Sequence, residues 1–307
     1  PYAYGDANWE DKLTAYNGKT ITYDAIGNPM TDGTWTYQWQ AGRQLKQMTK
    51  SGTTIQFKYD HNGLRVGKVV NGTETKYMLH GKLVTHLTVG SDSLHFFYDT
   101  QSRPAKVSFN GTVYTYIHNL QGDIVGILDS SGNLVVEYKY DAWGKPIATT
   151  GSMAATLGKR NPFRYRGYIY DEETELYYLR SRYYNPVVGR FVNADTQMGW
   201  TSLMGKNMYL YCMNAPSLLS DSNGFSPVIE PRPSCPENWD ADYRAEFRRE
   251  RMQALVRKAA KAVMQAVRNV NLYRMVLQLA NHGGGVIKFK SGSKATCYTR
   301  TCSHYLQ

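Results

Sequence analysis

The chain has 307 residues, a formal net charge of +11 and 25 Tyr against only 9 Phe. This length allows one large domain or two modest ones, and the absence of any run of 18 apolar residues excludes a transmembrane helix. The four cysteines are too few and too scattered for a disulfide scaffold, and the N-terminus has no basic stretch followed by an apolar one, so no signal peptide is expected. Abundant tyrosine suits partly wet sheets, in which the ring packs and the hydroxyl stays solvated.

A tyrosine–aspartate pair recurs through the first 140 residues, with a period of about twenty residues that indicates a repeat architecture. Full copies begin at Tyr23, Tyr59, Tyr98 and Tyr140, and degenerate copies begin at Trp39, Tyr77 and His118. The first residues of the chain already lie inside a repeat unit. We therefore expect the chain to be the C-terminal part of a larger protein.

Each repeat unit reads as two short strands and a turn. Residues 53–59 alternate apolar and polar side chains and are rich in β-branched and aromatic types, which indicates a half-buried strand. Asp60 and Gly63 supply the turn, because Asp bonds its own backbone and Gly accepts a positive φ. Residues 64–70 then return as a second strand. Stacked units of this kind predict an elongated, strongly curled antiparallel sheet.

Residues 161–225 have a different character and contain a dense aromatic and arginine motif. The central string, at 177–191, is YYLRSRYYNPVVGRF. It resembles the core that follows the repeats in the Rhs/YD-repeat family, the polymorphic toxins of bacteria. The resemblance covers residues 20–225 and does not reach the C-terminal region, which in that family differs from member to member.

The resemblance implies an architecture and a setting. Members of the family build a hollow β-shell from stacked repeats, the core plugs one end of the shell, and a C-terminal toxic domain sits inside or emerges from it. It implies a secreted or cell-surface bacterial protein whose partners are the remainder of its own shell and a small acidic immunity protein. In several members the core is also an intramolecular aspartyl protease that cuts the chain just after the core.

Two aspartates occupy the positions of that protease. An aspartyl mechanism needs two close carboxylates that share one proton, since two like charges at short range cannot both ionise. By the resemblance, Asp195 and Asp221 are these carboxylates, and cleavage falls between Phe225 and Ser226. Neither aspartate is followed by the proline of the family pattern, and Ala194 stands where an arginine often precedes the first one. The missing prolines would loosen the site, and the alternative is that both residues are turn carboxylates.

A change of composition after residue 225 predicts a domain boundary. A proline-rich linker over 226–239 follows the core. Residues 226–307 hold 14 Lys and Arg against 6 Asp and Glu, and therefore carry most of the excess positive charge. We predict a repeat sheet over 1–160, a plug-like core over 161–225, this linker, and a variable basic domain over 240–307.

The C-terminal region reads as mainly helical with a terminal hairpin. Apolar residues at three- and four-residue spacing predict a helix over 240–281, with a break at 269–271, and strands near 286–290 and 295–299 follow. A basic helical face predicts contact with nucleic acid, and its members are Arg248, Arg251, Lys258 and Lys261. The alternative is a solvated cationic helix that packs against an acidic shell interior or an immunity partner.

Candidate catalytic groups in this region are few. His282 and His304 could act as base and acid of a metal-independent ribonuclease, although His282 also suits a helix C-terminus through the macrodipole. Cys297, Cys302 and His304 lack a fourth zinc ligand at useful spacing. We therefore predict neither a metal nor a cofactor.

The sequence as a whole predicts a mainly β fold, an antiparallel shell fragment with a plug-like core, followed by a small mainly α region. The favoured function is a toxin fragment that releases its basic C-terminal effector by self-cleavage. The alternative is a structural or adhesive cell-surface YD-repeat protein with an inactive C-terminal extension.

Overall fold

The computed structural model describes residues 1–196, 207–225, 228–229, 286–290 and 294–298. The chain divides into two compact units, 1–232 and 233–307. In the second unit, strands β24 (Val286–Lys290) and β25 (Lys294–Tyr298) form an antiparallel hairpin, as the sequence predicts. The helix predicted over 240–281 lies outside the described residues.

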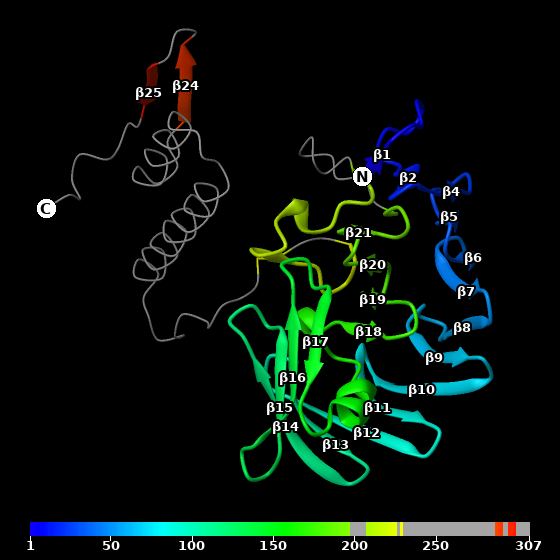
Figure 1. The fold of residues 1–307 in the computed structure, drawn as a ribbon, viewed down its shortest axis with the longest axis vertical. Helices are drawn as coiled ribbons and strands as arrows, with labels where there is room; N and C mark the ends of the chain where they lie inside the picture. Colours follow the sequence, from blue (N-terminus) through cyan, green and yellow to red (C-terminus); the bar gives the residue numbers. More distant parts are fainter. Residues whose placement is uncertain (197–206, 226–227, 230–285, 291–293, 299–307) are drawn as a thin grey trace, which may run out of the picture. The chain divides into compact units, whose positions relative to one another are not determined.

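The first unit is dominated by a 14-stranded sheet in which every neighbour in space is also a neighbour in sequence. Adjacent strands of this sheet run antiparallel, so the sheet is a simple meander. It curls around the core segment (Figure 1). Its strands are β4 (Thr22–Tyr23), β5 (Pro29–Thr31), β6 (Thr36–Gln40), β7 (Gln44–Lys50), β8 (Thr53–Tyr59), β9 (Arg65–Val70), β10 (Thr73–His80), β11 (Leu83–Val89), β12 (Asp92–Tyr98), β13 (Pro104–Phe109), β14 (Thr112–His118), β15 (Ile124–Leu128), β16 (Leu134–Tyr140) and β17 (Pro146–Thr150).

The aspartate of each repeat organises the turn, as the sequence predicts. In the unit after β8, the Asp60 carboxylate accepts the backbone N–H groups of Asn62 at 2.9 Å and Leu64 at 2.8 Å. Gly63 follows with a φ of 77°, which a residue with a Cβ rarely adopts. Asp99 and Asp141 repeat this arrangement. The aspartate side chain of each of these turns therefore accepts the backbone N–H groups of its own turn.

The hydroxyl groups of the repeat tyrosines form hydrogen bonds within the sheet. The Tyr59 hydroxyl donates a 2.8 Å hydrogen bond to the Leu45 carbonyl, and the hydroxyls of Tyr98 and Tyr140 likewise reach backbone carbonyls of the preceding strand. In the degenerate copy, the Trp39 indole N–H serves the same purpose. Each aromatic residue therefore bridges two strands at the point where the ladder ends, because a half-buried hydroxyl needs a partner.

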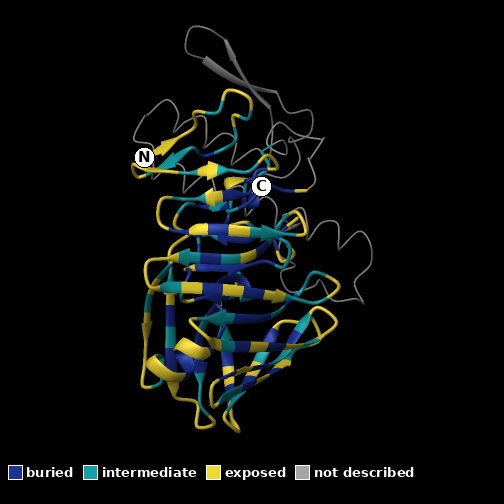
Figure 2. Ribbon diagram, turned by 90° about the vertical axis from the view of Figure 1, so that its right-hand side faces the viewer, coloured by how far each residue is buried: buried dark blue, intermediate teal, exposed yellow. Residues whose placement is uncertain are grey.

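The concave face of the sheet is dry. Along β8, Ile55 and Phe57 are buried while the residues between them are exposed, and the same alternation bands the strands in Figure 2. The buried side chains form two clusters against the core segment, one of which joins Leu45, Ile55 and Phe57 to core residues such as Tyr178. The large sheet therefore forms a curved wall, and its concave face packs against the core segment.

The core segment forms a small sheet of its own. Its strands are β18 (Ile169–Asp171), β19 (Leu176–Tyr178), β20 (Tyr183–Asn185) and β21 (Arg190–Phe191), which pair in that order. The π-helical turn η1 (Ala154–Gly158) and the 3-10 turn η2 (Tyr165–Gly167) lead into it. The 3-10 turn η4 (Cys212–Asn214) and the two-stranded β22 (Leu219–Ser220) and β23 (Val228–Ile229) follow it, and β1 (Tyr2–Ala3), β2 (Ala15–Tyr16) and β3 (Lys19–Thr20) form a separate N-terminal sheet.

Buried charges fix the core segment to the wall. Arg65 of β9 forms a two-pronged ion pair with Asp171 of β18, with N–O distances of 2.5 and 3.1 Å, and Lys68 adds a third contact at 3.0 Å. The side chains of Arg65 and Asp171 are 0% and 1% exposed. The Arg65 guanidinium also lies 4.5 Å from the ring centroid of Tyr178. This contact determines how the core sheet lies against the wall.

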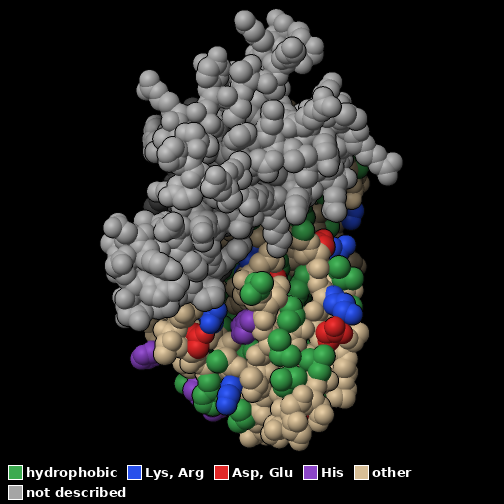
Figure 3. All heavy atoms as spheres, turned by 90° about the vertical axis from the view of Figure 1, so that its left-hand side faces the viewer, with side chains coloured by type: hydrophobic (Ala, Val, Ile, Leu, Met, Phe, Trp, Pro, Cys, Tyr) green, Lys and Arg blue, Asp and Glu red, His purple; other side chains and the backbone are tan. Residues whose placement is uncertain are grey.

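The outer surface is mixed in character. On the face that looks left in Figure 1, over the last strands of the large sheet, apolar side chains are interspersed with charged groups and histidines (Figure 3). Leu134 of β16 and Ile147 of β17 are two of the exposed apolar residues of the large sheet. Among the described residues, the structure contains no helix that is both long and apolar enough to cross a bilayer.

Candidate active site

Three segments of the core bring the site residues together. Arg182 lies in the turn between β19 and β20, Asp195 follows β21, and Asp221 follows β22. Their side chains are all buried, with exposed fractions of 5%, 10% and 1%. The two aspartates are 26 positions apart in sequence, and folding places both beside one guanidinium.

Arg182 connects the two carboxylates. Its Nη2 atom lies 2.8 Å from Oδ2 of Asp195 and 3.7 Å from Oδ2 of Asp221. Its Nη1 atom donates to the Met208 carbonyl at 3.1 Å, and its Nε atom donates to the carbonyl of Gly224. Burial lowers the pKa of Arg182 to about 10, which still leaves it cationic at neutral pH. The arginine therefore holds both acids and the chain just before the predicted cleavage position.

Asp221 is the member of the pair with the perturbed acidity. Burial raises the pKa of its carboxyl, and repulsion by Asp195 adds to the rise, while Arg182 and backbone N–H donors oppose it. Its Oδ1 atom accepts the Gly224 N–H at 2.8 Å, whereas its buried Oδ2 atom makes no hydrogen bond in the described structure. Its own N–H donates to the Tyr168 hydroxyl at 2.7 Å. Asp221 thus closes a turn through one oxygen and presents the other to Arg182.

The turn before the predicted cleavage position requires glycine. Gly224 has a φ of +76°, and a Cβ there would lie 2.8 Å from the Leu179 carbonyl oxygen and 3.1 Å from the Arg182 nitrogen. These are backbone atoms, so the clash cannot be relieved by a side-chain rotation. Ser181 donates to the Asn223 carbonyl at 2.7 Å. These contacts hold the turn that the missing proline after Asp221 was expected to loosen.

The wall positions the loop that carries Asp195. Arg43, in the turn between β6 and β7, donates to the Ala194 carbonyl at 2.9 Å. Gly27, in the repeat turn between β4 and β5, accepts the Ala194 N–H at 3.2 Å and the Tyr209 hydroxyl at 2.9 Å. A Cβ at Gly27 would come within 2.6 Å of that hydroxyl. Two turns of the wall therefore fix the position of the first aspartate.

Of the other site residues predicted from the sequence, the structure describes only Phe225. Phe225 is 40% exposed at the end of the described turn, and Ser226 lies outside the described residues. The six predicted C-terminal residues also lie outside them: His282, His304, Arg248, Arg251, Lys258 and Lys261. Where the structure is described, no three His, Cys, Asp or Glu side chains gather as metal ligands.

Sequence reasoning missed the residues that organise the site. Arg182 stood in the central aromatic string, whose specificity was a signal that it has a role. Nothing local marked Arg43, Gly27 or Tyr168, because each acts on a segment more than 50 positions away.

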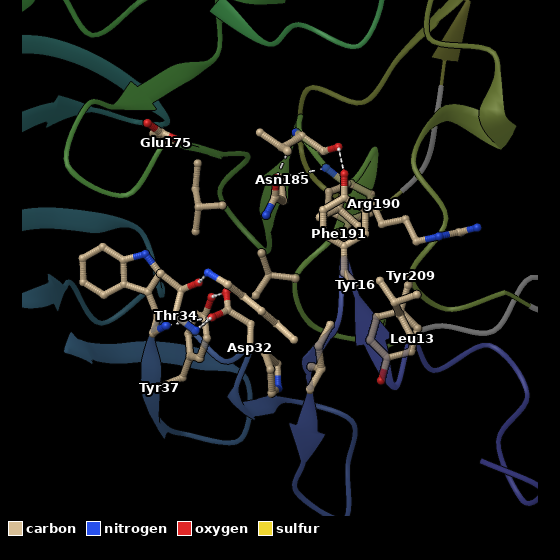
Figure 4. A pocket seen from close by; sticks show the side chains of 18 of the residues that line it. Leu13, Tyr16, Asp32, Thr34, Tyr37, Glu175, Asn185, Arg190, Phe191 and Tyr209 are labelled. Carbon is tan, nitrogen blue, oxygen red and sulfur yellow. Dashed lines mark hydrogen bonds between the residues drawn. The ribbon is translucent and has the colours of Figure 1, made fainter. Parts of the chain in front are cut away.

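A separate cavity of about 290 Å³ lies between the N-terminal strands and the core sheet (Figure 4). Its acidic residue Asp32 is already engaged, accepting two backbone N–H groups and the Tyr37 hydroxyl. Asn185 likewise accepts backbone N–H groups. Neither Asp195 nor Asp221 lines this cavity, so it is not part of the paired-carboxylate site.

Comparisons with known proteins agree with the fold. The Teneurin YD-shell family matches residues 6–216. The tRNA nuclease WapA of Bacillus subtilis is 38% identical over 235 residues, which cover 71% of this chain and 10% of that protein. Toxin subunit YenC1 of Yersinia entomophaga is 26% identical over 250 residues, covering 71% of this chain and 24% of that protein. The chain thus spans about a tenth of the length of the WapA proteins it matches.

Solved structures show the same architecture. The crystal structure of TcdB2-TccC3-Cdc42 aligns with a TM-score of 0.56 at 20% sequence identity, covering 66% of this chain and 11% of that one. The likeness is one of fold. With a family match over residues 6–216, and a repeat sheet that curls around an aromatic core, the chain belongs to the YD-shell family of Rhs/YD-repeat toxins.

Proposed function

We propose that residues 1–160 are the last stretch of a toxin shell and that the core over 161–225 plugs it and cuts the chain after Phe225. The observation that carries this proposal is the convergence of Asp195 and Asp221 on the one guanidinium of Arg182. A pair of buried carboxylates whose environments differ is the arrangement that acid–base hydrolysis requires.

The roles follow from the contacts. Asp195, which makes the shorter ion pair, takes the proton from a water as general base. Asp221, whose pKa is raised by burial, keeps a proton and donates it toward the carbonyl oxygen of Phe225. The water oxygen bonds to the carbonyl carbon, and the C–N bond to Ser226 then breaks. The departing amine takes up the proton that Asp195 accepted from the water, and the hydroxyl formed on the carbonyl oxygen returns its proton to Asp221 as the new carboxyl group forms. Arg182 positions both acids and holds the Gly224 carbonyl, one residue before the bond.

The proposal is tested by following the mass of the purified chain. We expect the chain to separate into 1–225 and 226–307, with Ser226 as the new N-terminus, and both Asp195→Asn and Asp221→Asn to remain intact. Asp129→Asn is the matched control, because Asp129 closes an exposed repeat turn far from the site in sequence. An intact wild-type chain, or an Asp195→Asn chain that separates at the wild-type rate, would contradict the proposed cleavage.

The released segment 226–307 is proposed to be a basic effector that acts on nucleic acid. Its charge supports this, with 14 Lys and Arg against 6 Asp and Glu. Two similar proteins are named as tRNA nucleases, although the aligned part is a tenth of their length. We propose His282 and His304 as its base and acid. The proposed phosphate contacts are Arg248, Arg251, Lys258 and Lys261. The proposed partner is an acidic immunity protein.

Expression of residues 226–307 in bacteria separates this effector from the alternative of an inactive extension. Growth arrest with fragmented tRNA, abolished by His282→Ala or His304→Ala, supports a ribonuclease. Healthy growth with an abundant, folded product supports the structural or adhesive protein. Secretion, as the toxin relatives suggest, is tested by locating the full-length protein in culture fractions.

A further inference from the structure

A second cavity, of about 350 Å³, lies where the turns of the wall meet the core segment. It is lined by five cationic side chains and by no Asp or Glu: Arg65, Lys82, Arg103, Arg166 and Arg180. Three serines and three tyrosines also line it, and Ser220 and Ser222 are two of the serines. The field inside such a cavity depends on how many of these cations are compensated, because low-dielectric walls concentrate the field of any charge left unpaired.

Three of the five cations are already paired with carboxylates. Arg65 pairs with Asp171, Arg166 with Asp123 at 3.6 Å and Arg103 with Asp99 at 2.9 Å. Within the described part of the chain, Arg180 and Lys82 make no ion pair and no hydrogen bond through their side chains. Lys82 is exposed at the rim, whereas Arg180 is partly buried. The uncompensated charge of the cavity therefore belongs mainly to Arg180.

The backbone at Arg180 is an independent sign that its side chain is needed there. Its φ is +68°, in the left-handed region that glycine adopts freely and an arginine does not. Burial also lowers the pKa of Arg180, and only the hydroxyl groups of Tyr178 and Tyr98 counter that effect. Neither the local conformation nor a partner in the described structure accounts for a guanidinium at this position, and strained residues of this kind are concentrated at binding and catalytic sites.

We propose that this cavity binds a small phosphate-bearing anion through Arg180, with Lys82 and the hydroxyls of Ser220 and Ser222 as further donors. A planar guanidinium matches two phosphate oxygens at once. The volume is in the range of small-molecule sites and exceeds what a single phosphate fills, so the ligand carries more than one phosphate or an organic group. The site is distinct from the paired carboxylates and does not depend on their proposed cleavage reaction.

The test is a titration of the full chain with inorganic pyrophosphate and, separately, with ADP, by calorimetry at low salt. The Asp195→Asn background keeps the chain uniform whether or not it cleaves itself. We expect Arg180→Gln, which keeps most of the side-chain stem, to weaken binding roughly tenfold or more, and Lys82→Gln to weaken it only a few-fold. Lys139→Gln removes an exposed charge on β16 and is the matched control, with no expected effect.

The outcomes are distinct. Binding that Arg180→Gln weakens and Lys139→Gln leaves unchanged supports the site. Tighter binding of ADP than of pyrophosphate shows that the site also recognises a nucleoside, whereas equal binding shows that it recognises the linked phosphates alone. A wild-type chain that binds neither probe overturns the proposal. So does binding that is equal in the Arg180→Gln and Lys139→Gln chains, provided that both melt as cooperatively as the parent.

Discussion

Replacement of Arg65 by methionine should release the core from the wall at its most deeply buried contact. The change leaves the Asp171 carboxylate, 1% exposed, with only Lys68 at 3.0 Å as a cationic partner. Removal of one partner of a buried ion pair typically costs about 3–5 kcal/mol. Because Lys68 remains, we expect the lower end, about 3 kcal/mol, which corresponds to a fall in Tm of roughly 6–12 °C for a unit of this size.

The assay is thermal and urea unfolding followed by near-ultraviolet circular dichroism, which reports the packed tyrosines of the first unit. The double replacement Arg65→Met with Asp171→Leu is the control. A hydrophobic substitute for a buried pair is often neutral or stabilising, so the double variant should regain most of the lost stability. If Arg65→Met costs under about 1 kcal/mol, or the double variant is the less stable of the two, the reasoning is refuted.

The same pair gives a pH dependence with a defined sign. Burial would raise the pKa of Asp171, but attraction by Arg65 and Lys68 outweighs burial and lowers it below the usual value. A depressed carboxyl pKa contributes stability that is present above the unfolded-state pKa and is lost as the pH falls through the folded-state pKa. As the pH falls from about 5 to below the usual carboxyl pKa of about 3.9, the wild-type chain should therefore lose more stability than the double variant. Equal losses would contradict a lowered pKa of Asp171.

Three further predictions concern the paired-carboxylate site. The raised pKa of Asp221 contributes stability at low pH that is lost as the pH rises through that pKa. Asp221→Asn should therefore raise Tm at pH 7 but not at pH 3. Equal shifts in Tm at the two pH values would contradict the raised pKa. Gly224→Ala should destabilise by about 1–3 kcal/mol, clearly more than the control Gly72→Ala in urea unfolding, because Gly72 has a similar φ but open space around it. Arg43→Ala should slow release of 226–307 roughly tenfold to a hundredfold by mass spectrometry, with partial recovery in Arg43→Lys, whereas wild-type rates would exclude a role for the wall.

Most of the wall could be predicted from the sequence because its determinants are local. The strand predicted over 53–59 is β8. The return strand predicted over 64–70 is β9, which begins one residue later, at Arg65. The Asp60 turn follows from short-range hydrogen bonds between residues two and four positions apart. The partner of the Tyr59 hydroxyl could not be predicted in this way, since Leu45 lies on another strand and its position depends on how the strands pair.

The sequence by itself determined the repeat, the alternation of buried and exposed side chains and the identity of Asp195 and Asp221 as candidates, because motif spacing and side-chain period are properties of a short stretch of chain. Only the tertiary structure decided that both aspartates lie beside Arg182 and that Arg43 and Gly27 of the wall hold the first of them. It also decided that Arg180 has no carboxylate partner among the residues that the structure describes. These facts depend on contacts between residues far apart in sequence. Such contacts are fixed by the closure of the sheet around the core, and no local pattern of residues encodes them.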